Sequence, residues 1–220
     1  MESNNNYRQK ISTETAQILL DIGAVSFRFD PPFTFTSGIK SPIYLDNRII
    51  MSHPRQRRNI ISYYIEIIKG EIGLSKIDYI SGTASAAIPQ AAWISGELDL
   101  PMVYVRPTTK SYGKGNKLEG FLKKGSKVLI VEDHISTATS VVGNFQTITE
   151  LGSRVVGCVA TTTYETAESI EALKKHSISL NTLTTGRKIV EEALKKGTIS
   201  EKEKATVDRW FEDPALWSSS

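Results

Sequence analysis

The order of apolar and polar positions along the chain predicts strands and helices in alternation. Short apolar runs, typical of buried strands, stand at residues 77–80, 102–105, 128–131, 155–162 and 178–180. Between two of these runs, apolar residues recur at helical spacing, at Val141, Val142, Phe145 and Ile148. Strand, helix and strand in this order require crossover connections. The pattern therefore predicts an α/β fold with a parallel sheet.

The first 50 residues follow a different pattern, which predicts a small N-terminal subdomain. Residues 1–6 are polar and are expected to fray, and a helix is expected over about Ser12–Ile22, because Gly23 ends it. Residues 25–29 alternate as a strand does, and the segment 33–46 predicts a further turn and strand.

Near the C-terminus the sequence predicts two more helices, one around residues 189–194 and one over 201–211. Three aromatic residues are expected to dock them on the N-terminal subdomain: Trp210, Phe211 and Trp217. We therefore expect a single domain over 1–220, with a core at about 54–185 and a subdomain made of about 1–50 plus the C-terminal helices.

Composition and charge exclude several classes of protein. The formal net charge of +3 is small for 220 residues, so it does not predict a general nucleic-acid-binding surface. No apolar stretch approaches the roughly 20 residues of a membrane helix. The one cysteine, Cys158, excludes an internal disulfide and suits a reduced interior. We expect a cytoplasmic protein with neither nucleic acid nor a membrane as partner, and the three scattered histidines predict no histidine-based metal site.

The stretch 127–140 carries the strongest chemical signal. Its apolar run Val128–Val131 predicts a strand buried on both faces, Glu132 and Asp133 stand where this strand is expected to end, and the small residues Thr137–Ser140 predict a helix start. Free N–H groups and the positive end of the helix dipole would hold a phosphate dianion there. Carboxylates repel phosphate, so the two acids would accept hydrogen bonds from sugar hydroxyls or face a magnesium ion that the substrate brings. A solvated acidic turn before an ordinary N-cap is the alternative.

This stretch resembles the phosphoribosyl-diphosphate (PRPP) motif of type I phosphoribosyltransferases, which has an apolar strand, two acids, two apolar residues and then small hydroxyl and glycine residues. Other segments resemble the orotate phosphoribosyltransferases in particular. They are Phe33–Tyr44 with its Ser-Gly-Ile-Lys-Ser-Pro sequence, Lys110–Asn116, and Gly82–Ala84 ahead of Ile88 and Pro89. The resemblance implies a type I phosphoribosyltransferase-like parallel sheet flanked by helices, with the N-terminal subdomain forming a hood over a base.

The resemblance also implies an activity and a set of binding residues. The activity is transfer of the 5-phosphoribosyl group from PRPP to orotate in pyrimidine biosynthesis, with Mg²⁺ carried by PRPP. The implied PRPP-binding residues are Gly82, Thr83, Ala84 and the run Glu132, Asp133, His134, Ile135, Ser136, Thr137, Ala138, Thr139 and Ser140. The implied orotate-binding residues are Ser136, Lys40 and Tyr44. Taken singly, Lys40 also fits an exposed hairpin lysine, and Tyr44 fits a core residue of a strand.

A basic loop follows the strand at 102–105. From Arg106 to Lys117 it has four basic residues, two glycines and no acid, so it is expected to be mobile when empty and to attract pyrophosphate. By the resemblance, Arg106, Lys110 and Tyr112 bind PRPP, and Lys110 and Asp133 are catalytic. The loop would act in the neighbouring subunit's site, which requires a homodimer. A plain surface loop is the alternative.

The chain departs from the family's pattern in both segments. Alanine replaces a common glycine at 87 and a nearly invariant one at 138, His134 replaces an aliphatic residue, and the loop has Pro107, Thr108 and Tyr112 where the family has lysines and a histidine. Alanine at 138 costs about 1–2 kcal/mol if its backbone is left-handed and almost nothing if it is right-handed. The departures leave open a non-catalytic relative that senses PRPP or a nucleotide. A third possibility is the same chemistry on another base, against which the segment 37–44 argues.

Overall fold

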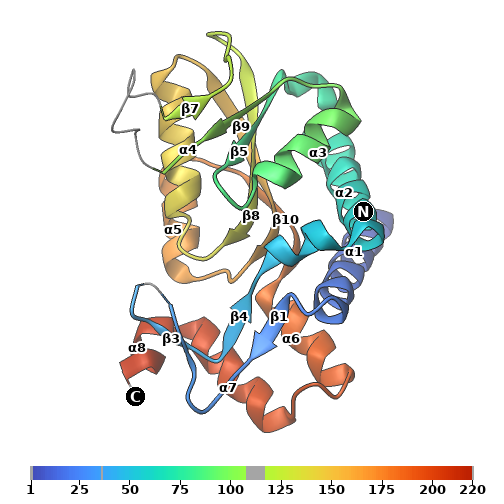
Figure 1. Ribbon diagram of the computed structural model, residues 1–220, viewed down its shortest axis with the longest axis vertical. Coiled ribbons are helices and arrows are strands. Elements are labelled where there is room, and N and C mark those ends of the chain that lie inside the picture. The colour runs from blue at the N-terminus through green and yellow to red at the C-terminus, as the bar shows by residue number, and fades with distance from the viewer. Residues whose placement is uncertain (1, 36, 108–116, 220) are drawn as a thin grey trace.

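A computed structural model describes residues 2–35, 37–107 and 117–219 and shows a central sheet between two layers of helices (Figure 1). The sheet has the strand order β10–β9–β8–β5–β6–β7. Its strands are β5 (Tyr79–Thr83), β6 (Met102–Val105), β7 (Leu118–Glu119), β8 (Lys127–Ile135), β9 (Arg154–Thr163) and β10 (Leu180–Thr185). Only the β6–β7 pair is antiparallel. The predicted α/β class and parallel sheet are therefore confirmed.

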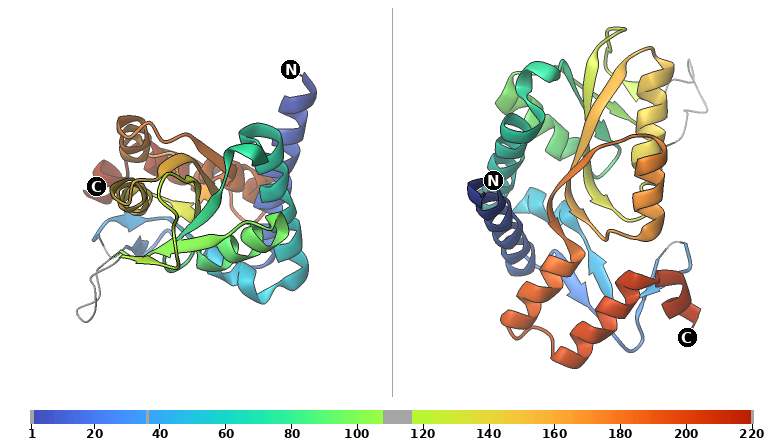
Figure 2. Two further views of the ribbon diagram at one scale, coloured as in Figure 1. Left: turned by 90° about the horizontal axis from the view of Figure 1, so that it is seen from above. Right: turned by 180° about the vertical axis from the view of Figure 1, so that it is seen from behind.

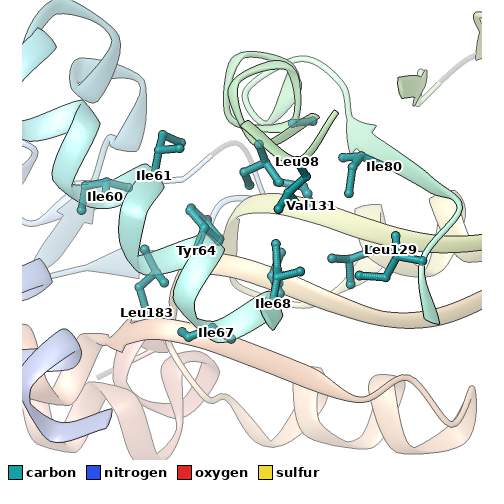
Figure 3. Packing of buried hydrophobic residues seen from close by; sticks show 14 of the residues in the cluster. Ile60, Ile61, Tyr64, Ile67, Ile68, Ile80, Leu98, Leu129, Val131 and Leu183 are labelled. Atoms are coloured by element: carbon teal, nitrogen blue, oxygen red, sulfur yellow. The ribbon is translucent and has the colours of Figure 1, made fainter. Parts of the chain in front are cut away.

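Helices cover both faces of this sheet. One face carries α2 (Pro54–Ile67), continued by η2 (Ile68–Ile72) and η3 (Leu74–Lys76), together with α3 (Ile88–Leu98); the other carries α4 (Thr139–Glu150) and α5 (Ala167–Lys175) (Figure 1). Figure 3 shows Tyr64 and Ile68 of the first layer in one cluster with Leu129 and Val131 of β8. Ile130 packs instead with residues of α4 and α5. Since consecutive residues of β8 are buried on opposite sides, the predicted double burial of this strand is confirmed.

The hood combines the two ends of the chain. Its N-terminal part has α1 (Glu2–Asp21), β1 (Val25–Phe27), β2 (Phe33–Thr34), β3 (Lys40–Ser41), β4 (Ile43–Leu45) and η1 (Asn47–Ser52), and its C-terminal part has α6 (Gly186–Lys195), α7 (Glu201–Glu212) and α8 (Pro214–Ser219). Figure 2 shows β1, β4 and the C-terminal helices together at one end of the molecule, with α1 running from there alongside the core. Trp210 and Phe211 are buried in their common core, and Trp217 packs against it. The indole N–H of Trp210 donates to the carbonyl of Lys40 (2.8 Å), so the C-terminal helices hold the β2–β3 hairpin.

The start of the chain differs from the prediction. Helix α1 begins at Glu2, so the frayed tail expected over residues 2–6 was wrong. The guanidinium of Arg8 lies 3.3 Å from the carboxylate of Glu71 and donates to the carbonyl of Thr182 (3.1 Å). These contacts fix a turn of helix that the local sequence alone does not favour, because its asparagines are weak helix formers.

Strand ends differ as well, and the differences concern the candidate site. Strand β8 continues through Glu132 and Asp133 to Ile135, because β9 runs beside it as far as Thr163. Strand β5 likewise extends to Thr83, paired with Val105 of β6. The last strand covers 180–185 instead of 178–180, and α8 was not predicted. Each extension comes from pairing or packing with a distant segment, which the local apolar pattern does not report.

Candidate active site

The two acids of the motif lie near the end of β8, where the chain turns into α4 (Figure 1). Glu132 is only 4% exposed, and its Oε1 accepts a hydrogen bond from the N–H of Asp133 (3.1 Å). Burial, and then the neighbouring Asp133 charge, raise the pKa of Glu132 well above its ordinary value. Burial also raises the pKa of Asp133.

The second oxygen of Glu132, Oε2, is buried and has no hydrogen-bond partner among the residues described. Buried polar atoms in folded proteins are almost always paired. A carboxylate oxygen left in this state is suited to accept a hydrogen bond from a ligand hydroxyl or to face a cation.

Helix α4 begins directly after the acids, and no side chain caps it. Its first internal hydrogen bond runs from the N–H of Val142 to the carbonyl of Ala138 (3.0 Å), so the N–H groups of Thr139 and Ser140 have no partner inside the helix. The hydroxyls of Thr137 and Thr139 lie 2.9 Å apart at this end. An open helix N-terminus surrounded by hydroxyl groups is suited to bind a phosphate.

Two hollows of about 480 Å³ each meet at this turn. The first contains basic and hydroxyl side chains, and its lining includes Thr83, Ala84, Arg106, Lys117, Thr137, Thr139, Ser140 and Asn144. The second opens towards the hood, and its lining includes Phe35, Ile39, Ser136, Thr137 and Trp210. Thr137 lines both hollows, so the turn between β8 and α4 lies between a basic side and a hood side.

The end of β5 forms the wall of the first hollow. Gly82 is required there, because a Cβ at this position would lie 2.9 Å from the Cβ of Ala91 on α3. Thr83 follows Gly82 and lines the hollow together with Ala84. Ala87 has a right-handed backbone with φ −88°, so alanine in place of glycine is unstrained there.

The backbone of Ala138, in contrast, is left-handed, with φ +64°. Of the two backbone conformations considered for alanine at 138, the structure has the left-handed one, which costs about 1–2 kcal/mol. The residue is 4% exposed and its methyl group packs with Ile130 and Val141. Of the two glycine replacements, only the one at 138 strains the chain.

His134 points away from the hollows. Its Nδ1 lies 2.8 Å from the hydroxyl of Thr162, and its ring meets that of Tyr164 edge-on at 4.2 Å. Burial lowers the pKa of His134 to about 3, so the ring is neutral at physiological pH. This departure therefore adds no positive charge beside Asp133. The next residue, Ile135, is buried in the cluster beneath α4.

The hood residues predicted to face a base lie on β3 and β4. Tyr44 is 37% exposed, packs 5.7 Å from the ring of Phe33, and accepts a hydrogen bond from Arg48 (3.4 Å). The main chain of Lys40 is held by Trp210 and by the hydroxyl of Ser218 (2.9 Å). Neither Tyr44 nor Lys40 is among the residues that line the hood-side hollow with Ser136.

The basic loop is placed only at its ends. Arg106 forms an ion pair with Glu119 of its own chain (3.2 Å), and Arg106, Pro107 and Lys117 line the first hollow. Lys110, Tyr112 and Thr108 lie outside the described residues.

Two buried asparagines at the site were not predicted. Asn47, on η1 of the hood, donates from Nδ2 to the carbonyl of Asp133 and to the hydroxyl of Thr162, at 2.7 Å each. Asn144, on α4, bonds to Ser81 and Thr83 of β5. A signal existed for Asn144, because it lies three residues after Val141 and four before Ile148 and is thus a polar side chain on the apolar face of a predicted helix. Nothing in the local pattern marks Asn47.

Over the described ranges, no three histidine, cysteine, aspartate or glutamate side chains gather as a metal site. In the same part of the chain, no helix combines the length and apolar character that crossing a bilayer requires.

Comparisons with known proteins agree with this arrangement. No protein-family profile matches the chain. Curated relatives named orotate phosphoribosyltransferase include one from Listeria innocua, 42% identical over 94% of this chain and 98% of the relative, and one from Coxiella burnetii, 40% identical over the same shares. Among solved structures, the orotate phosphoribosyltransferase of Aeropyrum pernix has a TM-score of 0.72 and 26% identity over 84% of this chain and 99% of that one. The UMP synthase of Leishmania donovani has a TM-score of 0.76 and 27% identity over 90% of this chain and 42% of that one.

The raised pKa of Glu132 predicts that the site costs stability. Below the unfolded-state pKa near 4.5, both folded and unfolded chains hold the proton; as the pH rises through the raised folded-state pKa, the folded state loses stability relative to the unfolded one. We expect Glu132→Gln to raise the free energy of unfolding at pH 8 by at least about 1 kcal/mol, with the gain vanishing towards pH 4.5. Urea unfolding at both pH values measures this.

The matched control is Glu171→Gln, the same change at an exposed position of α5. Its effect should stay within about 0.5 kcal/mol at either pH. Equal effects of the two substitutions at pH 8 would contradict the burial cost assigned to Glu132.

Proposed function

The chain belongs to the orotate phosphoribosyltransferase family, and we propose that its own site transfers the 5-phosphoribosyl group from PRPP to N1 of orotate, which gives orotidine 5′-monophosphate and pyrophosphate. The observation that carries this proposal is the uncapped N-terminus of α4, which lines the first hollow and stands one short turn after the strand that carries both acids. Had a side chain capped these N–H groups, the site could not receive a phosphate.

The parts of PRPP are assigned to the parts of the site by charge. The 5′-phosphate takes the free N–H groups and hydroxyls of residues 137–140. The ribose hydroxyls donate to Glu132 and Asp133, and Oε2 of Glu132 has the free acceptor capacity that this requires. As the bond at the anomeric carbon breaks, positive charge develops on the sugar, and the nearby carboxylate of Asp133 stabilises it.

The oxygens of these two acids also suit a magnesium ion that arrives bound to PRPP. The two acids offer oxygens of the kind that Mg²⁺ binds through one or two carboxylates plus substrate phosphates. Bound to the diphosphate, the ion would neutralise part of the leaving charge. The protein's own contribution is to hold the ribose and the two phosphate ends at fixed positions.

On the hood side, we propose that orotate lies against Ser136, with Tyr44 and Lys40 completing its site. The hood-side hollow carries the acids Glu168, Glu212 and Asp213 in its lining. These acids repel the carboxylate of orotate. The carboxylate therefore turns towards the cation of Lys40, and the ring faces the partly exposed Tyr44.

On the basic side, pyrophosphate would lie between Gly82–Ala84 and the loop that starts at Arg106. Arg106 lines the hollow of its own chain, whereas Lys110 and Tyr112 are proposed to close the site of a second copy. This arrangement needs a homodimer. The lone buried thiol of Cys158 supports a reducing, cytoplasmic location.

The alternative function is that of a sensor that binds PRPP or a nucleotide without turnover. One observation favours it, the strained left-handed Ala138 at the phosphate turn. The neutral His134 and the unstrained Ala87 give it no support.

An activity assay separates these two functions. We expect the protein, mixed with magnesium and PRPP, to consume orotate, seen as a loss of its absorbance. Lys110→Ala should abolish this loss, because the leaving pyrophosphate then lacks a cation. Tight PRPP binding without turnover on any base would instead support the sensor.

Relief of strain at residue 138 should improve substrate handling. Because the backbone there is left-handed, Ala138→Gly removes a cost of about 1–2 kcal/mol from the turn that holds the phosphate, so we expect the KM for PRPP to fall by up to about tenfold. Steady-state kinetics at saturating orotate measures this.

Ala87→Gly is the matched control, since residue 87 is right-handed and has no strain to relieve. It should leave the KM for PRPP unchanged and lower the free energy of unfolding by about 1 kcal/mol, from the greater backbone entropy of glycine. A loss of activity in Ala138→Gly would show that the turn works better with alanine and would refute this account of the strain.

Sharing of the basic loop between subunits predicts complementation. Lys110→Ala damages the loop and Ser136→Asp damages the phosphate turn, because the added carboxylate repels the ligand. Mixed after co-refolding, the two inactive variants should form hybrid dimers that contain one intact site, and part of the activity should return. If the loop serves its own subunit, the mixture stays inactive.

A further inference from the structure

A chain of buried hydrogen bonds links α4, whose first turn is assigned to the 5′-phosphate, to β5, whose end lines the first hollow. The hydroxyl of Ser81 donates to Oδ1 of Asn144 (2.9 Å), and Nδ2 of Asn144 donates to the hydroxyl oxygen of Thr83 (3.0 Å). The three side chains are 0%, 1% and 6% exposed in the order Ser81, Asn144 and Thr83. Both Asn144 and Thr83 line the first hollow.

The direction of this chain follows from the amide of Asn144. Its Nδ2 can only donate, so the hydroxyl oxygen of Thr83 accepts from it. Its Oδ1 can only accept, and it takes the proton of Ser81.

This direction has a chemical consequence for whatever enters the hollow. A free threonine hydroxyl turns to donate or to accept, as its neighbour requires. With one lone pair of its oxygen occupied by Asn144, the hydroxyl of Thr83 keeps its proton for a ligand in the hollow that Thr83 lines. Phosphoryl oxygens accept hydrogen bonds, so a hydroxyl held as a donor favours a diphosphate over a ligand that itself donates.

The same contact also fixes a spacing. Asn144 projects from α4, the helix whose first turn is assigned to the 5′-phosphate, and Thr83 ends β5, which is assigned to pyrophosphate. Movement of α4 relative to β5 would break both bonds of the Asn144 amide. Such a break leaves buried polar groups unpaired, which costs about 1–3 kcal/mol for each group.

We propose that Asn144 is a positioning residue that holds Thr83 as a hydrogen-bond donor to the diphosphate of the substrate and keeps the two anion sites at a fixed separation. The inference rests on the proposed function for the identity of the diphosphate. Its core, the dependence of diphosphate binding on the Asn144–Thr83 contact, is measurable without any turnover.

The test is a double-mutant cycle with magnesium pyrophosphate as the probe, read by titration calorimetry on the full-length protein. Thr83→Val removes the donor. Asn144→Leu keeps the size of the side chain, removes the N–H that holds the hydroxyl of Thr83, and adds no charge to the hollow. We expect each change to weaken pyrophosphate binding about 10- to 100-fold, as expected for a lost hydrogen bond to a charged group.

The double variant should bind no more weakly than Thr83→Val alone, because the two residues act as one unit. Thr83→Ser, which keeps the hydroxyl, should bind within about threefold of the wild type. The matched control is Thr147→Val, which removes another buried hydroxyl of α4, one that donates only to the carbonyl of Gly143 (2.9 Å). It should leave pyrophosphate affinity unchanged.

A merely structural role of Asn144 predicts a different result. It would lower the free energy of unfolding and weaken all ligands together, whereas the positioning role raises the KM for PRPP and leaves the KM for orotate within about twofold of the wild type. If Asn144→Leu does not fold, Asn144→Ala takes its place in the cycle with the same expected non-additivity.

Additive losses in the cycle, or unchanged affinity in Asn144→Leu, would overturn the proposal. A wild-type protein that binds pyrophosphate but transfers nothing to orotate would overturn the proposed activity and leave the role of Asn144 in place. The two failures are therefore distinguishable.

Discussion

The site depends on one constraint, the removal from water of two adjacent carboxylates near the end of a central strand. Glu132 and Asp133 leave water at a cost that raises the pKa of both, and the fold accepts this cost instead of ending β8 before them. Strand β9 continues alongside to keep the main chain paired, and Tyr64 donates to the carbonyl of Glu132 (3.2 Å). One carboxylate oxygen stays without a donor, as expected of a site kept ready for a ligand at the expense of stability.

The departures from the family's pattern have unequal physical weight. Ala87 and Ala138 both stand where relatives have glycine, yet the first has a right-handed backbone and the second a left-handed one. The histidine at 134 looks like a change of charge in the sequence, but the ring is buried, bonded to Thr162 and neutral. Of the departures at 87, 134 and 138, only the strain at 138 therefore bears on the proposed phosphate turn.

The sequence predicted the central strand β8 and the helix α4 well, because the apolar run 128–131 and the helical spacing after it depend only on local burial. It did not predict that β8 passes through the acids, since that depends on β9, a separate part of the chain. The sign of φ at Ala138 was undecided because alanine itself does not fix it. Asn47 and Asn144 act through partners that lie 61 to 115 residues away in sequence, which no local pattern reports.

The bonds of Asn47 also bear on the order of events during synthesis. Its amide joins the hood to residues 86 and 115 positions further along the chain, at Asp133 and Thr162. A ribosome must therefore release the segment that contains β9 before this contact can form, and long-range contacts of this kind are slow to close. The growing polypeptide thus carries its two acids before the surroundings that complete the site, and ligand recognition arises only after β9 has left the ribosome.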